Sequence, residues 1–146
     1  MNGKDIEAVL QQEGVFVSTT VGVSMYPMLR DRRDTIIIRP CTGRLKKYDI
    51  PLYRCGEKYI LHRIVKVEPD SYVICGDNCR NREYGVRDGQ ILGVLAGFYR
   101  GAKPVDMNGI GYRAYVRLWC AAYPLRYGYK SARILLGRLY RKIRKL

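Results

Sequence analysis

The sequence has no long apolar run. The first twelve residues carry Lys4, Asp5 and Glu7, and the longest uncharged stretch after Asp106 covers only residues 118–125. A membrane-spanning helix needs roughly 20 apolar residues. We therefore expect neither a secretory signal nor a membrane anchor, and we predict a cytoplasmic protein whose membrane contact, if present, is peripheral.

Histidine is scarce, and the cysteines follow no pairing pattern. His62 is the single histidine, and the five cysteines are odd in number with no repeated C-x-x-C motif: Cys41, Cys55, Cys75, Cys79 and Cys120. This usage indicates reduced thiols and argues against a disulfide scaffold. His62, Cys75 and Cys79 are soft ligands, but the spacing of the two cysteines is unusual for zinc. We expect no metal and no other cofactor.

Acidic residues are few and end early. The 146 residues include 27 Lys and Arg against 13 Asp and Glu, a formal net charge of +14. Because Asp106 is the last acid, residues 107–146 carry +10 and residues 1–106 carry +4. This surplus favours a polyanionic partner, with an anionic membrane surface preferred over nucleic acid. The length fits one ordinary domain, which we place at residues 1–106, followed by a basic tail at 107–146.

Short strands dominate the predicted domain. Residues 3–12 have helical apolar spacing and are followed by Gly14, which predicts a short N-terminal helix. Runs rich in Val, Ile, Thr and Tyr predict strands at residues 15–23, 34–39, 48–54, 58–68, 71–75 and 90–99. Turns are expected at residues 55–57 and 68–70. The fold class is therefore mainly β.

The basic tail has a helical pattern. We predict helices at residues 112–122 and 131–146, separated by a break at Pro124. In the second helix, apolar and basic residues lie on opposite faces, namely Leu135, Leu136, Leu139, Ile143 and Leu146 against Arg138, Arg141, Lys142, Arg144 and Lys145. Two interpretations remain open, a terminal helix packed on the domain and an interfacial helix that binds an anionic membrane through residues 112–146. The unbroken positive charge favours the second.

Three polar features in the domain could carry chemistry. Ser24 stands between a glycine and a proline in Gly22-Val23-Ser24-Met25-Tyr26-Pro27, although taken alone such a serine merely caps a turn. It is not a G-x-S-x-G elbow, because Tyr26 replaces the closing glycine. His62 is the only side chain with an ordinary pKa near 6.5, so it is the natural base for a hydroxyl nucleophile. A polar turn follows at Gly76-Asp77-Asn78, with Glu83 beyond it.

In order, the segments Ser24-Met25-Tyr26-Pro27, Arg33-Asp34-Thr35-Ile36-Ile37-Ile38, His62-Arg63-Ile64-Val65 and Gly76-Asp77-Asn78 resemble the motifs of the type I signal peptidase family over about residues 15–100. The resemblance implies a mostly β serine-peptidase fold, to which the residue patterns described above add a short N-terminal helix and a basic helical C-terminal segment. It makes Ser24 the nucleophile and His62 the base, as in the histidine-type members. Glu83 matches their third member, and Asp77 is the competing acid.

Two positions depart from the family pattern. Arg33 replaces the glycine before Asp34, and Gly22 stands where many members have a serine that helps to hold the oxyanion. The backbone N–H of Ser24 is then the expected oxyanion donor. Between the two acids, we assign Glu83 to His62 and Asp77 to the turn that contains it.

The sequence therefore predicts a serine endopeptidase that cleaves a precursor or leader peptide. By resemblance, it would cut after small residues and receive an extended substrate along Val21, Val23 and Met25. A lysine base is an alternative, because strand alternation would put Lys58 and Lys66 on the same face as His62. A non-catalytic basic adaptor that binds anionic membrane or nucleic acid is the other alternative.

Overall fold

The computed structural model describes residues 3–143 of the chain. Side chains are described from Ile6 to Arg141, apart from those of Lys130, Arg138 and Leu139. The chain divides into two compact units, Met1–Gly109 and Ile110–Leu146, and each is described by itself below.

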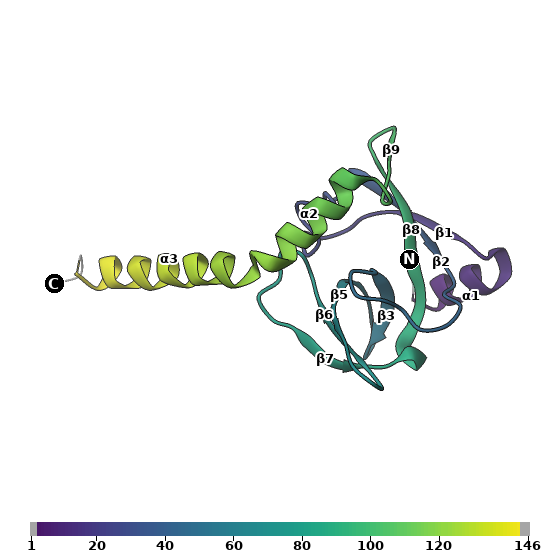
Figure 1. The fold of residues 1–146 in the computed structure, drawn as a ribbon, viewed down its shortest axis with the longest axis horizontal. Helices are drawn as coiled ribbons and strands as arrows, with labels where there is room; N and C mark the ends of the chain where they lie inside the picture. Colours follow the sequence, from purple (N-terminus) through teal and green to yellow (C-terminus); the bar gives the residue numbers. More distant parts are fainter. Residues whose placement is uncertain (1–2, 144–146) are drawn as a thin grey trace. The chain divides into compact units, whose positions relative to one another are not determined.

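The larger sheet of the first unit curls into a half-barrel (Figure 1). Its strands follow the order β1-β2-β8-β3-β4, all neighbours are antiparallel, and β9 extends the sheet beside β8. The elements are α1 (Gly3–Glu13), β1 (Phe16–Thr19), β2 (Asp34–Arg39), β3 (Pro51–Cys55), β4 (Lys58–Leu61), β8 (Ile91–Arg100) and β9 (Lys103–Val105). Because β1 ends the order, its outer side is a sheet edge.

A second sheet contains β5 (Arg63–Val67), β6 (Tyr72–Cys75) and β7 (Glu83–Val86), followed by the short helix η1 (Asp88–Gln90). Both predicted turns are present. In the first, Gly56 has a φ of 60° and joins β3 to β4 through the pairing of Cys55 with Lys58. In the second, the backbone N–H of Glu68 donates to the carbonyl of Ser71 over 2.9 Å between β5 and β6.

The prediction of a mainly β domain after a short N-terminal helix is confirmed. Three predicted strands are wrong in extent, and one of them, expected over residues 48–54, begins only at Pro51. Residues 58–68 form two strands in different sheets rather than one, with His62 between them, and the strand expected over residues 15–23 ends at Thr19. The prediction missed β7 and β9, which have three or four residues and almost no buried side chains, so no apolar alternation marks them.

The core of the first unit joins its two sheets. Tyr53 of β3 packs with side chains of the second sheet and of the preceding loop, namely Leu45, Ile64, Tyr72, Ile74 and Val86. Burial of these large apolar groups is the main stabilising contribution to a domain of this size. The core also brings the end of β4 and the start of β5 beside β7, which positions the candidate site.

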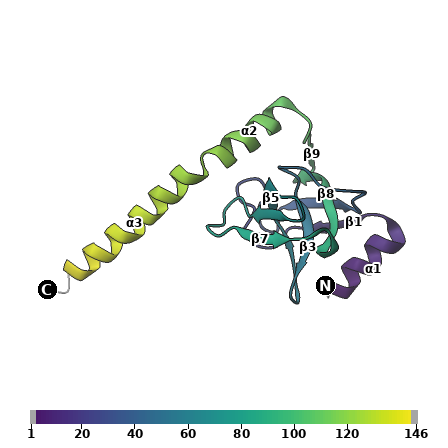
Figure 2. The same ribbon diagram turned by 60° about the horizontal axis from the view of Figure 1, so that its bottom comes forward.

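The described part of the second unit, residues 110–143, forms two helices, α2 (Ile110–Ala121) and α3 (Tyr123–Ile143), shown from two sides in Figures 1 and 2. The prediction that the second helix begins at Ser131 is wrong. The helix begins at Tyr123, and Pro124 lies in its first turn, where a missing N–H has no cost. The guanidinium of Arg126 lies 3.8 Å from the ring centre of Trp119 and donates to the Trp119 carbonyl, which ties the two helices together.

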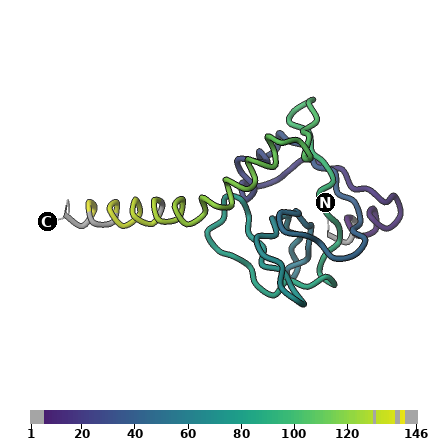
Figure 3. The backbone as a smooth tube through the Cα atoms, viewed as in Figure 1, coloured from purple at the N-terminus to yellow at the C-terminus, as the bar shows by residue number. Residues whose placement is uncertain are grey.

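Part of the predicted tail amphipathicity can be checked. Leu135, Leu136 and Arg141 are exposed. The other residues of the two predicted faces lie outside the described side chains, namely Leu139, Ile143, Leu146, Arg138, Lys142, Arg144 and Lys145. Grey stretches of the trace in Figure 3 mark residues of this kind. Among the described residues, no helix is both long enough and apolar enough to cross a membrane.

Candidate active site

Ser24 lies in the loop between β1 and β2, and hydrogen bonds close this loop at its base. The backbone N–H of Thr20 donates to the Asp34 carbonyl over 2.9 Å, and its hydroxyl donates to the Arg30 carbonyl over 2.7 Å. The buried Asp34 carboxylate accepts from the backbone N–H of Arg30 over 2.9 Å. Asp34, from the partial second motif, therefore helps to hold the serine loop in shape.

The segment just before Ser24 has left the strand. Gly22 has a φ of 96°, a conformation that favours glycine, and its N–H donates to the Asp31 carboxylate over 2.7 Å. Ser24 itself is half-buried, and within the described part of the chain neither its N–H nor its hydroxyl makes a hydrogen bond. Both groups are thus available to a bound molecule, whereas the N–H of Gly22 is not.

The Gly-Asp-Asn turn is attached directly to this loop. The backbone N–H of Asn78 donates to the Ser24 carbonyl over 2.7 Å, and its side-chain amide donates to the Val23 carbonyl over 3.2 Å. A Cβ atom added to Gly76 would lie 2.7 Å from the Ser24 carbonyl and 2.9 Å from Nε2 of His62. The Ser24 backbone and the histidine ring are therefore close neighbours, and only glycine fits at position 76.

His62 lies where the chain passes from β4 to β5, and the residue is buried with 7% exposure. Its Nδ1 is 3.0 Å from Oε1 of Glu83, at the start of β7, where Glu83 pairs with Ile74 of β6. Burial lowers the pKa of His62 below its ordinary value, and the Glu83 carboxylate offsets part of that shift. The ring is therefore neutral near pH 7, and a proton on Nδ1, facing Glu83, leaves Nε2 as a proton acceptor.

Tyr53 is a member of the site that sequence reasoning missed. Its hydroxyl lies 3.4 Å from Nδ1 of His62, and the residue is completely buried in the core. Burial and the adjacent Glu83 carboxylate raise the pKa of this hydroxyl above its ordinary value, so it stays protonated. No sequence signal distinguishes Tyr53 from the other tyrosines among the 13 in the chain.

Asp77 has a partner that the sequence did not suggest. We assigned its carboxylate to its own turn, and both of its oxygens accept hydrogen bonds from the Arg63 guanidinium, each over 2.8 Å. Both side chains are almost completely buried. Arg63 also donates to the Tyr48 carbonyl and to the Met28 sulfur. Asp77 therefore clamps the turn to β5, while Glu83 is the carboxylate that contacts His62.

Another side chain near Nε2 was not singled out as a neighbour of His62. Sγ of Cys79 lies 3.9 Å from this nitrogen, within hydrogen-bonding distance for sulfur, and the residue is half-buried. Cys79 is the residue directly after the Gly-Asp-Asn turn. Its contact with His62 depends on how the fold brings this turn beside the histidine ring, so the sequence alone does not reveal it. Among the described residues, no three His, Cys, Asp or Glu side chains are arranged to hold a metal ion.

Other predicted residues lie elsewhere. Lys66 is mainly exposed and its Nζ pairs with Glu68 over 3.0 Å, and Lys58 is exposed, because the predicted single strand is broken at His62. The alternation argument for a lysine base on the histidine face is therefore wrong. Val21 and Val23 are exposed, whereas Met25 is 4% exposed and belongs to the core rather than to a substrate groove.

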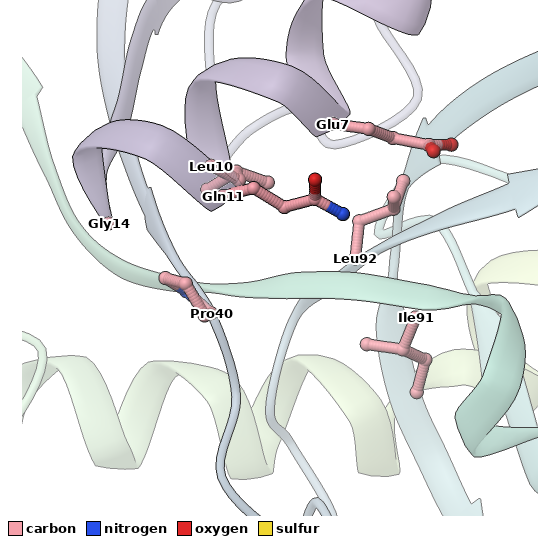
Figure 4. A pocket seen from close by; sticks show the side chains of 7 residues that line it. All are labelled: Glu7, Leu10, Gln11, Gly14, Pro40, Ile91 and Leu92. Atoms are coloured by element: carbon pink, nitrogen blue, oxygen red, sulfur yellow. The ribbon is translucent and has the colours of Figure 1, made fainter.

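A pocket of about 420 Å³ lies apart from this cluster, between α1 and the start of β8. Figure 4 shows the residues that line it, Glu7, Leu10, Gln11, Gly14, Pro40, Ile91 and Leu92. None of these is a predicted site residue.

Comparison of the chain with models of known protein families, with curated proteins and with solved structures finds no match.

The buried ion pair yields a stability prediction. Asp77→Ala should lower the free energy of unfolding by about 3–5 kcal/mol, because the Arg63 guanidinium would remain buried without its counter-charge. Chemical denaturation followed by circular dichroism measures this change. Asp70→Ala, at an exposed turn, is the matched control and should change stability by less than about 0.5 kcal/mol. Equal stabilities of the two variants would show that the ion pair does not stabilise the fold.

Proposed function

We propose that this chain is a serine endopeptidase of the signal-peptidase type that cleaves a precursor or leader peptide. The observation that carries the proposal is the contact of Glu83 with Nδ1 of His62, combined with the attachment of the Ser24 loop, through Asn78, to the turn beside Nε2. These contacts support the proposal because they supply two features of such a site, a third group that holds the ring of the base and a serine loop fastened to the turn beside Nε2.

In the proposed reaction, the Ser24 hydroxyl attacks the carbonyl carbon of the scissile peptide bond while Nε2 of His62 takes its proton. Glu83 stabilises the imidazolium that forms, and His62 then gives the proton to the leaving amine. Water, activated by the same nitrogen, hydrolyses the acyl-enzyme. The hydroxyl and Nε2 are not hydrogen-bonded in the described structure, and we expect this bond to form with substrate, because catalytic hydrogen bonds often shorten on binding.

The backbone N–H of Ser24 supports the proposal as an oxyanion donor. It makes no hydrogen bond within the described residues, whereas the N–H of Gly22 is already committed to Asp31. A donor that is free before substrate arrives needs no rearrangement to stabilise the developing negative charge.

The edge strand β1 is a suitable docking place for an extended substrate. Its outer side is unpaired in the described sheet, and exposed Val17, Val21 and Val23 follow the chain from this strand to Ser24. A peptide that adds to such an edge gains main-chain hydrogen bonds and places alternate side chains against the valines. The expected preference for small residues before the cut comes from the family resemblance.

The serine is the first point to test. Ser24→Ala should reduce peptide cleavage by a factor of about 10³ or more, because alanine lacks the hydroxyl that acts as the proposed nucleophile. The fold should be retained. The measurement is mass spectrometry of a library of unstructured peptides with central Ala, Gly and Ser residues, incubated with each variant.

Ser71→Ala is the matched control for this experiment, since Ser71 lies in the turn between β5 and β6, away from β1, and its hydroxyl donates to the Glu68 carboxylate over 3.2 Å. This control should cleave like the parent protein. Cleavage by Ser24→Ala at the parent rate would disprove the peptidase proposal.

The role of Glu83 predicts a pH effect with a definite sign. In the parent, kcat/KM should rise with pH as His62 loses its proton, and the midpoint of this rise should lie below pH of about 6.5, because burial lowers the histidine pKa. Glu83→Gln removes the charge that offsets this shift, so the rising limb should move to lower pH. The plateau should also fall by about 10³–10⁴-fold, since the imidazolium loses its support.

Glu57→Gln, at the exposed hairpin, is the control and should leave both the limb and the plateau unchanged. A merely structural role for Glu83 would lower the plateau without moving the limb. A limb that moves to higher pH would contradict the assignment of Glu83 to His62.

A second proposal concerns the second unit, which we infer to bind anionic membrane surfaces. The described part of α3 exposes the apolar side chains of Leu125, Ile134, Leu135, Leu136 and Tyr140 together with the basic Arg133 and Arg141, and the unit contains no acid. An exposed helix that combines apolar and basic side chains is suited to the boundary between headgroups and acyl chains. The same exposure is compatible with the alternative of a basic adaptor for nucleic acid.

Binding to vesicles tests this inference on the full chain. The protein should bind phosphatidylcholine vesicles that contain phosphatidylserine, and the affinity should fall as salt is added. Replacing both Arg133 and Arg141 with Gln should weaken binding about 30-fold, because each basic residue contributes roughly 1 kcal/mol near such a surface. The exposed pair Arg32 and Arg33 of the first unit supplies a matched double variant that should bind normally. Tighter binding to RNA than to vesicles would favour the adaptor.

A further inference from the structure

Cys79 stands beside the nitrogen that the proposed reaction uses. Its Sγ lies 3.9 Å from Nε2 of His62, and its backbone N–H donates to the Gly76 carbonyl over 2.9 Å, which fixes the thiol at the end of the turn. A Cβ atom at Gly76 would lie 2.6 Å from this sulfur. The absence of a side chain at position 76 therefore allows the sulfur and the ring to meet.

The contact at the other ring nitrogen, Nδ1, determines whether Nε2 can accept the proton of this thiol. Because Glu83 accepts a hydrogen bond at Nδ1, the neutral ring presents the lone pair of Nε2 toward Cys79. A thiol becomes a nucleophile when it loses its proton, and a neighbouring imidazole held by a carboxylate is one of the arrangements that removes it. Cys79, His62 and Glu83 thus form a thiol counterpart of the serine arrangement.

The remaining cysteines lack this arrangement, since His62 is the only histidine in the chain. Cys75 is buried and its sulfur contacts backbone carbonyls, and burial raises the pKa of the Cys41 thiol. Cys55 is exposed at the β3–β4 hairpin, and it serves as the reference for a freely accessible thiol. Cys79 is half-buried, so preferential reaction there would report activation rather than access.

We propose that Cys79 is a site of covalent modification by soft carbon electrophiles, with His62 as the base that activates it. Nε2 takes the thiol proton, and the thiolate forms a bond to the electrophilic carbon. With an alkyl iodide the carbon–iodine bond breaks and iodide leaves, and the imidazolium then releases its proton to water. The adduct occupies the space beside Nε2 and thereby closes the site to a peptide substrate. This closure rests on the proposed peptidase function, whereas the activation of the thiol does not.

Alkylation of the full chain with iodoacetamide, followed by peptide mass mapping, tests the activation. Near neutral pH, Cys79 should react at least about tenfold faster than Cys55. In His62→Gln, the rate at Cys79 should fall about tenfold while that at Cys55 stays constant. Equal rates at the two cysteines, or an unchanged Cys79 rate in a His62→Gln protein with a native circular dichroism spectrum, would overturn the proposal.

A second variant guards against misfolding, because His62 is buried. The side chain of Glu83 is partly exposed, so Glu83→Gln is expected to fold. This substitution should also slow alkylation of Cys79 selectively, since Nδ1 of His62 loses its carboxylate partner. An unchanged ratio of the Cys79 and Cys55 rates in folded Glu83→Gln would likewise count against the activation.

The closure of the site is measured separately, by peptide cleavage before and after alkylation. Iodoacetamide should abolish cleavage by the parent, whereas the treated and untreated forms of Cys79→Ala should cleave equally. Full cleavage by a protein alkylated at Cys79 would disprove closure. If the untreated parent cleaves nothing, the peptidase proposal fails, and the two alkylation rates still decide whether His62 activates Cys79.

Discussion

The buried ion pair of Arg63 and Asp77 joins the parts from which the candidate site is built. Arg63 is the residue after His62, and Asp77 stands between Gly76 and Asn78, so one pair of charge-assisted hydrogen bonds fixes the ring and the turn together. The Arg63 guanidinium also donates to the sulfur of Met28, which lies in the same β1–β2 loop as Ser24, so the attachment extends to the serine loop. An unpaired buried charge is costly, so the two side chains must keep the positions in which their hydrogen bonds form.

The state of His62 follows from a balance of opposing effects. Burial disfavours the charged ring, and Glu83, with the more distant Asp77, favours it, but burial has the larger effect on the pKa. Tyr53 adds a neutral hydroxyl on the same side as Glu83 and so limits how the ring can turn. The ring is consequently held in one orientation without being charged at rest, which is what a base requires before the reaction begins.

Local patterns in the sequence predicted most of the strands and both turns, and the family resemblance predicted the contact of Glu83 with His62. Local patterns could not reveal that the chain changes sheets at His62, because alternation along residues 58–68 is the same for one strand or two. Tyr53 and Cys79 were missed because their proximity to the ring depends on tertiary packing between segments. The ion pair of Asp77 was missed for a similar reason, since its partner Arg63 lies fourteen residues away in the sequence.

Gly76 has a consequence for how this centre could change over evolutionary time. A main-chain position without a side chain, rather than a set of interlocking side chains, defines the space where the ring nitrogen, the Ser24 carbonyl and the Cys79 sulfur converge. In the functions proposed above, an oxygen nucleophile and a sulfur nucleophile share one base across this space. Under those proposals, single substitutions in descendants would shift the site between hydroxyl and thiol chemistry, while any side chain at position 76 would block both routes.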